Sequence, residues 1–130
     1  MIVDSSAVVA VLRDERDAGP LRQALARAAR VVVGAPTLLE TSVVVGPSRH
    51  TDVHELLRDV GALVAPFGVE HARIARDACA RYGRGSGSPA RLNLGAAMSY
   101  AVAIATDEPL LFKGDHLVHT DVEAAVPDHA

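Results

Sequence analysis

Short apolar runs alternate along this chain with segments in which apolar residues recur at helical spacing. The runs predict strands at residues 1–4, 31–33, 63–67 and 109–112, with a short last strand around Val122. The periodic segments predict helices at residues 5–13, 18–30, 35–45, 51–60, 70–82 and 92–105. This alternation is typical of an α/β domain whose mostly parallel sheet lies between two layers of helices. We therefore predict a single three-layer αβα domain over residues 1–130, with four or five strands.

Local signals place the ends of several of these helices. Ser5 or Ser6 is expected to cap the first helix, and Thr51 or Asp52 is expected to cap the fourth. Pro47 is expected to end the third helix, because proline inside a helix removes a backbone hydrogen bond.

The composition is that of a folded protein and excludes some classes of function. Of the 130 residues, 49% are hydrophobic and 22% are charged, and the net charge is -3, unlike a disordered chain. This charge argues against non-specific duplex binding, which needs a dense basic surface, but it allows a local basic strip that holds RNA. The single Cys79 forms no internal disulfide, which fits a cytoplasmic protein. No run approaches the roughly 18 apolar residues of a membrane-spanning helix, so no membrane association is expected.

Two acidic residues lie inside apolar segments. Asp4 ends the first predicted strand, Glu40 lies in the helix after the second strand, and Asp115 and His116 follow the fourth. The carboxyl ends of parallel strands share one edge of a sheet, so these side chains are expected to lie close together. Converging carboxylates repel one another unless a cation neutralises them, and Mg²⁺ prefers such oxygen ligands. A cation of this kind can promote phosphodiester cleavage.

Other common chemistries lack their motifs. Cys79 has no accompanying histidine signature of a nucleophile, and the loop 83–89 lacks the lysine and the preceding strand of a phosphate-binding loop. A nucleotide-binding regulator on a similar sheet therefore receives little support.

Several motifs keep a characteristic order and spacing over nearly the whole chain. They are Ile2-Val3-Asp4-Ser5-Ser6-Ala7, Glu40-Thr41, Tyr82-Gly83-Arg84-Gly85, Ala90-Arg91-Leu92-Asn93-Leu94-Gly95, Ser99-Tyr100-Ala101, and Leu110-Leu111-Phe112-Lys113-Gly114-Asp115 with His119-Thr120-Asp121. Together they resemble the PIN-domain ribonucleases, specifically the VapC-type toxins of type II toxin–antitoxin pairs. The resemblance implies a PIN-like fold and an endoribonuclease that hydrolyses RNA phosphodiester bonds with Mg²⁺ or Mn²⁺.

The family's site is a set of acids that bind the metal. Asp4 and Glu40 match the first two of them, but Ala96 stands at the third position and His116 at the fourth. Asp115 is expected to substitute in part, which gives Asp4, Glu40 and Asp115 as catalytic residues and His116 as a further metal ligand. A turn acid remains an alternative for Asp115, and an ordinary surface residue remains one for His116.

Further residues are expected around this site. Ser6, Asn93, Ser99 and Asp121 are candidates to support the metal ligands, although Ser99 also suits helix packing and Asp121 a backbone turn. The candidates for contacts with RNA phosphates are Arg84, Arg91 and Lys113.

The resemblance also implies partners, namely a VapB-type antitoxin that occupies the cleft and a second copy in a homodimer. Ala96 and His116 support an alternative, in which a weakened or inactive PIN domain acts by binding antitoxin or RNA. The early break at Pro47 departs from the family pattern near the expected antitoxin contacts.

Overall fold

Four parallel strands form the centre of the computed structural model, which describes residues 1–127 and leaves residues 128–130 of the predicted domain outside the description. The strands lie in the order β3-β2-β1-β4, and their bounds are Ile2–Val3 (β1), Val32–Gly34 (β2), Leu63–Ala65 (β3) and Leu110–Leu111 (β4). The predicted α/β class and parallel sheet are confirmed. The strand expected around Val122 is reduced to a single bridge between Leu110 and Ala124.

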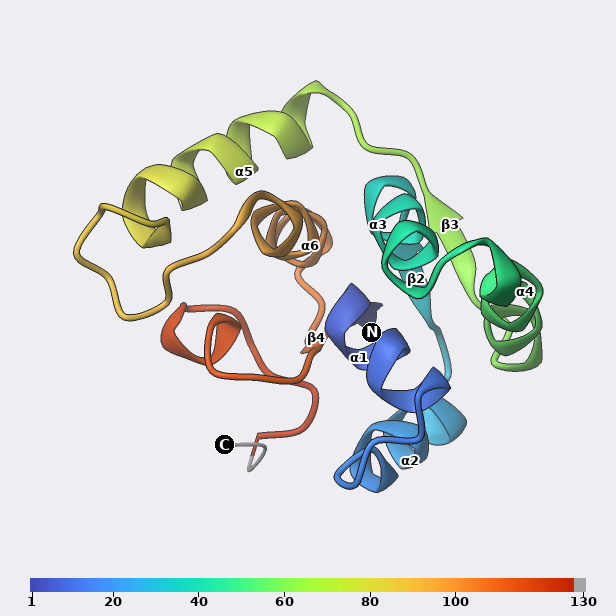
Figure 1. Cartoon of the computed structure of the whole chain (residues 1–130). Helices are drawn as coiled ribbons and strands as arrows, with labels where there is room; N and C mark the ends of the chain where they lie inside the picture. Colours follow the sequence, from blue (N-terminus) through green and yellow to red (C-terminus); the bar gives the residue numbers. More distant parts are fainter. Residues whose placement is uncertain (128–130) are drawn as a thin grey trace.

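One face of the sheet is covered by the helices α5 (Val69–Tyr82) and α6 (Leu94–Thr106) (Figure 1). Side chains along a strand point alternately to the two faces, and Ile2, Val32 and Leu110 all point to this one. They join a buried apolar cluster that includes residues of both helices.

The opposite face is covered mainly by α1 (Ser5–Leu12) and α2 (Gly19–Arg27). Val3 and Leu111, the neighbours in sequence of the residues on the first face, belong to this second cluster. The sheet therefore lies between two helical layers, as the alternation of strands and helices predicts. None of the helices within residues 1–127 has the length and apolar character needed to cross a bilayer.

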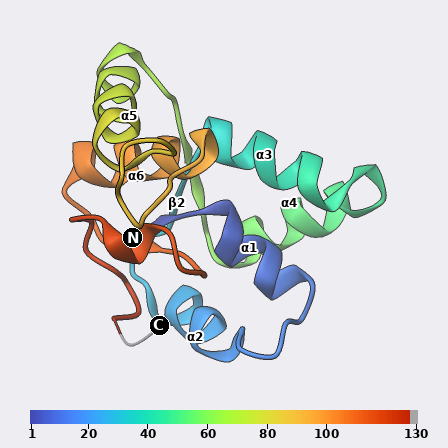
Figure 2. The same cartoon turned by 60° about the vertical axis from the view of Figure 1, so that its left-hand side comes forward.

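The helix α3 (Ala35–Val45) extends away from the sheet, and α4 (His50–Asp59) lies beside it (Figure 2). Val53 and Leu57 of α4 join Val33 of β2 in a third buried cluster. The third helix ends at Val45, before Gly46 with its φ of 87° and a short 3₁₀ helix over Pro47–Arg49. The break expected at Pro47 is therefore present.

Two of the expected helix caps are wrong. Asp4, rather than Ser5 or Ser6, caps α1, because its extended backbone lets its carboxylate accept a hydrogen bond from the Ser6 amide at 3.0 Å. The fourth helix begins at His50 without a side-chain cap, because the 3₁₀ helix before it runs directly into its first turn. Thr51 and Asp52 therefore lie inside α4.

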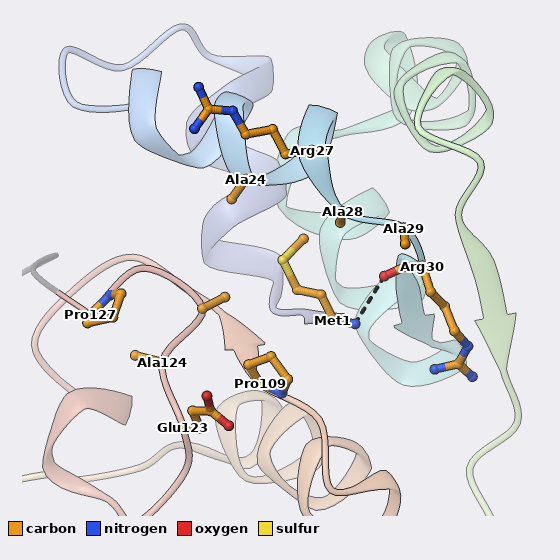
Figure 3. Close-up of a pocket in the computed structure, with 11 residues that line it drawn as sticks. Met1, Ala24, Arg27, Ala28, Ala29, Arg30, Pro109, Glu123, Ala124 and Pro127 are labelled. Carbon is orange, nitrogen blue, oxygen red and sulfur yellow. Dashed lines mark hydrogen bonds between the residues drawn. The ribbon is translucent and has the colours of Figure 1, made fainter.

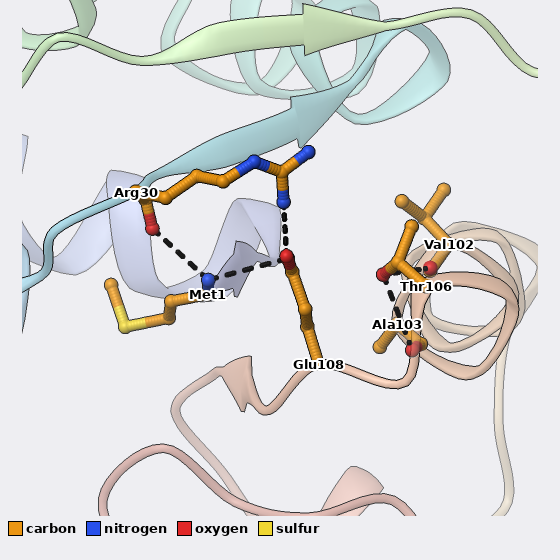
Figure 4. A network of polar contacts seen from close by, with 6 residues as sticks. All are labelled: Met1, Arg30, Val102, Ala103, Thr106 and Glu108. Atoms are coloured by element: carbon orange, nitrogen blue, oxygen red, sulfur yellow. Dashed lines mark hydrogen bonds and ion pairs between the residues drawn. The ribbon is translucent and has the colours of Figure 1, made fainter.

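Polar contacts tie the segments at the amino ends of the strands together (Figure 4). The amino group of Met1 donates to the carbonyl of Arg30 at 3.0 Å and lies 3.3 Å from the Glu108 carboxylate. The Arg30 guanidinium forms an ion pair with the same carboxylate. These contacts fix the chain just before β1, β2 and β4, and so they help to set the register of the sheet.

Candidate functional site

Asp4 lies where the chain leaves β1 at the carboxyl edge of the sheet, and it is only 5% exposed. Its Oδ2 accepts hydrogen bonds from the Ser6 amide at 3.0 Å and from the Ser6 hydroxyl at 2.6 Å. Its Oδ1 is buried and has no hydrogen-bond partner among the described residues. Burying a carboxylate oxygen without a partner costs free energy. This atom is therefore the clearest indication that a group outside the chain binds here.

Glu40 lies on α3, and its carboxylate reaches the same edge of the sheet. The hydroxyl of Ser5 donates a hydrogen bond to Glu40 Oε1 at 2.7 Å, although the two residues are 35 positions apart. Ser5 thus has a positioning role that the sequence did not indicate, because only the folded chain brings it to Glu40. Each of the two serines after Asp4 therefore orients one acid: Ser6 orients Asp4, and Ser5 orients Glu40.

A cavity of about 120 Å³ lies between these two acids. Several predicted site residues line it, from segments far apart in the sequence: Asp4, Ser6, Glu40, Asn93, Lys113 and His116, together with Ser5, Ala96 and Leu117. Asn93 also caps α6, because its Oδ1 accepts a hydrogen bond from the Ala96 amide at 2.8 Å. Ala96 itself lines the cavity with only a methyl group.

Five predicted site residues do not line this cavity, namely Arg84 and Arg91 in the loop before α6 and the three residues described next. Asp115 follows Gly114, whose φ is 111°, and its 83% exposed carboxylate bonds His119 Nε2 at 2.8 Å. Ser99 is buried, and its hydroxyl lies 3.0 Å from that of Thr37, so it joins α6 to α3. Asp121 accepts a hydrogen bond from the Tyr100 hydroxyl at 2.6 Å, away from the two acids.

His116 lines the cavity in a defined orientation. Its Nδ1 lies 2.9 Å from the carbonyl oxygen of Ala90. A carbonyl can only accept a hydrogen bond, so Nδ1 carries the proton in this contact. In the neutral ring, Nε2 then keeps its lone pair, which is the arrangement found in histidines that bind metals.

The predicted phosphate-binding residues differ in their surroundings. The Lys113 ammonium contacts Glu15 and lies 2.9 Å from Asp17 Oδ1. The hydrogen bond that Lys113 donates to Glu15, followed by the one that it donates to Asp17, raises the pKa of Lys113. Arg84 and Arg91 are exposed in the loop before α6, and within residues 1–127 their guanidinium groups form no ion pair.

The carboxylates suit a sparsely coordinated hard cation. No three His, Cys, Asp or Glu side chains in residues 1–127 are grouped closely enough to cage a metal ion, which excludes a closed structural zinc site there. Mg²⁺, however, keeps several waters and is usually bound through one or two carboxylates and the phosphates of a substrate. The unpartnered Asp4 Oδ1 and the neighbouring Glu40 fit that requirement.

A second polar cluster connects α5 and α6 to the C-terminal segment. Besides Tyr100, Asp121 has the Arg81 guanidinium 3.7 Å from its Oδ2, and its amide donates to the Tyr82 hydroxyl at 3.3 Å. The hydrogen bond from Tyr100 is the main cause that holds the pKa of Asp121 below its usual value, while burial raises the pKa of both tyrosines. This cluster stabilises the fold beside the site.

Replacing Tyr100 by phenylalanine is expected to lower the free energy of unfolding by about 1 kcal/mol at neutral pH, because half of the Asp121 side chain is exposed and solvent screens the contact. Since folding lowers the pKa of Asp121, its contribution is complete above the unfolded value of 3.8 and is lost as the pH falls through the lower folded value. Urea unfolding of both proteins at pH 7 and pH 3 should therefore show a smaller difference at pH 3. An equal difference at both values would contradict this assignment.

A larger cavity, of about 540 Å³, lies at the opposite edge of the sheet, between α2 and the segment near the C-terminus (Figure 3). It is lined mostly by small or apolar residues, among them Met1, Ala24, Ala28, Pro109 and Ala124. Among the described residues, Glu123 is the only acid that lines it, so it lacks the paired carboxylates of the smaller cavity.

Comparison with known proteins agrees with the fold. A family model for the PIN domain matches residues 1–123. Two Mycobacterium tuberculosis proteins named ribonuclease VapC42 and ribonuclease VapC28 are each 44% identical to this chain, over 96% and 97% of it and 98% of their own lengths. The crystal structure of Mycobacterium tuberculosis VapC20 is similar in fold, with a TM-score of 0.68 at 16% identity over 88% of this chain and 90% of that one.

Proposed function

The chain belongs to the PIN-domain family, and from this premise we propose that it is a metal-dependent endoribonuclease, the toxin of a VapBC-type toxin–antitoxin pair. Its reaction is the hydrolysis of RNA phosphodiester bonds. The observation that carries the proposal is the buried, unpartnered Oδ1 of Asp4 in a cavity shared with Glu40. The names of the VapC relatives support the substrate class.

The side chains that line the cavity would place an RNA phosphate beside the water that attacks it. Asp4 and Glu40 are the residues that would hold Mg²⁺ or Mn²⁺, and His116 lines the same cavity. Such a cation supplies activation of water and stabilisation of the departing oxygen. Ser5 and Ser6 fix the directions of the two carboxylates, so little reorganisation is needed when the substrate binds.

RNA contacts are assigned to Lys113, which lines the cavity, and to two arginines in the loop before α6. Arg84 and Arg91 form no ion pair within residues 1–127 and are free to bind phosphates of the flanking nucleotides. The ammonium group of Lys113 is paired with Glu15 and Asp17, so a phosphate would have to compete with these two carboxylates for it. Replacing both arginines by alanine should weaken RNA binding and reduce its salt dependence. Fluorescence anisotropy at several salt concentrations measures both quantities, and an unchanged salt slope would remove these arginines from the interface.

The proposal includes a VapB-type antitoxin and a homodimer. Leu39 and Val43, four residues apart on α3, are 66% and 70% exposed, which provides an apolar surface for a protein partner. Light scattering of the purified chain and of its Val43→Asp variant tests the homodimer. A monomeric parent chain would contradict it.

A second candidate function is a PIN domain that binds antitoxin or RNA with little or no cleavage. It is favoured by one observation, which is that Ala96 lines the cavity where an acid would complete the site. The two functions differ in whether the chain as it stands cleaves RNA.

A metal-removal experiment separates the two functions. Labelled RNA incubated with the chain and Mg²⁺ or Mn²⁺ should be cleaved internally, and excess chelator should stop cleavage until the cation is restored. RNA binding without cleavage under all these conditions would instead establish the binding function.

A further inference from the structure

Gly95, the second residue of α6, lies directly against the carboxylate of Glu40. A Cβ atom added to Gly95 would lie 2.6 Å from Glu40 Cδ and 2.7 Å from Oε1, and it would be closer still to Oε2. Real Cβ atoms essentially never make contacts this short. Either the carboxylate or the start of α6 would have to move if this residue were alanine.

The backbone does not explain a glycine at this position. Gly95 is helical, and its φ is not in the left-handed range that favours glycine. Alanine is the better helix former, so glycine here disfavours the helix. The space beside Glu40 is the remaining reason for it.

We propose that Gly95 is a positioning residue, whose missing side chain gives the Glu40 carboxylate its place beside Asp4. This inference rests on the proposed function and deepens it. Ser5 holds Glu40 Oε1 through a hydrogen bond, and the bare Cα of Gly95 leaves room for the rest of the group. The dependence is strong in this chain, because Asp4 and Glu40 are the only two acids among the described residues that line the cavity.

Calorimetric titration with Mn²⁺ and steady-state RNA cleavage test the proposal on the full chain. Gly95→Ala should lower Mn²⁺ affinity and kcat by about 10-fold or more, as expected when the support of a ligand is lost, while KM for RNA changes little. Gly19→Ala is the matched control, because Gly19 opens α2 and a Cβ there would meet nothing within 4 Å. Gly19→Ala should leave the Mn²⁺ affinity and kcat unchanged.

A double-mutant cycle with Glu40→Ala distinguishes this role from a general effect on the helix. In the Glu40→Ala background, Gly95→Ala should raise the melting temperature, since only the better helix former remains. With Glu40 present, Gly95→Ala should raise the melting temperature less or should lower it. If the parent chain neither binds Mn²⁺ nor cleaves RNA, the proposed function fails and the melting temperatures alone decide on Gly95. Unchanged Mn²⁺ affinity in Gly95→Ala, or equal temperature shifts in both backgrounds, would overturn the proposal.

Discussion

Replacing Asp4 by asparagine is expected to reduce RNA cleavage by a factor of at least about 100, while the fold stays as stable or becomes more stable. Asparagine keeps the side-chain oxygen that accepts hydrogen bonds from Ser6, so the cap of α1 survives. It removes the negative charge that the buried, unpartnered Oδ1 carries. Without a bound cation that charge is unfavourable, so the loss of activity should come with no loss of stability.

Cleavage rates and urea unfolding of the parent chain and the variant measure the two effects separately. Asp59→Asn provides the matched control, since it makes the same chemical change on a side chain that is 73% exposed, on α4. It should change neither quantity appreciably. An Asp4→Asn variant that cleaves normally, or one that fails to fold, would contradict the role assigned to Asp4.

Replacing Ala96 by aspartate is expected to raise Mn²⁺ affinity and the cleavage rate by about 10-fold or more. Position 96 lines the cavity beside both acids, and it lies in the first turn of α6, where a negative charge also favours the helix. The new side chain would add a third carboxylate to the two that line the cavity.

Ala96→Asn is the control for this gain, because it adds the same shape without the charge. Calorimetry with Mn²⁺ and cleavage assays on both variants, and on the double variant Ala96→Asp/His116→Asp, compare the effects. If only the aspartate variants cleave RNA, the chain as it stands is a binding protein. If asparagine and aspartate have equal effects, position 96 does not belong to a cation site.

Much of the architecture could be predicted because local patterns dominate it. Apolar runs such as Val31–Val33 mark the strands, and the carboxyl ends of parallel strands must share an edge, so the approach of Asp4 and Glu40 follows from topology. Pro47 likewise marks the end of α3 by its own chemistry.

The contacts that orient the site could not be predicted, because they join residues far apart in the sequence. Lys113 and Glu15 are 98 positions apart, and no local pattern relates them. Ser99 shares a helix with Ala96, but its hydroxyl meets Thr37 on α3 instead of the cavity. Asp115 points to solvent because of the turn at Gly114, which spacing alone does not reveal.

The binding of Mn²⁺ to the parent chain, followed by calorimetry or electron paramagnetic resonance, tests most directly whether Asp4 and Glu40 form one cation site. One ion per chain should bind to the parent protein, and binding should be lost in both Asp4→Asn and Glu40→Gln. Retained binding in either variant, or no binding to the parent chain even with RNA present, would contradict the account.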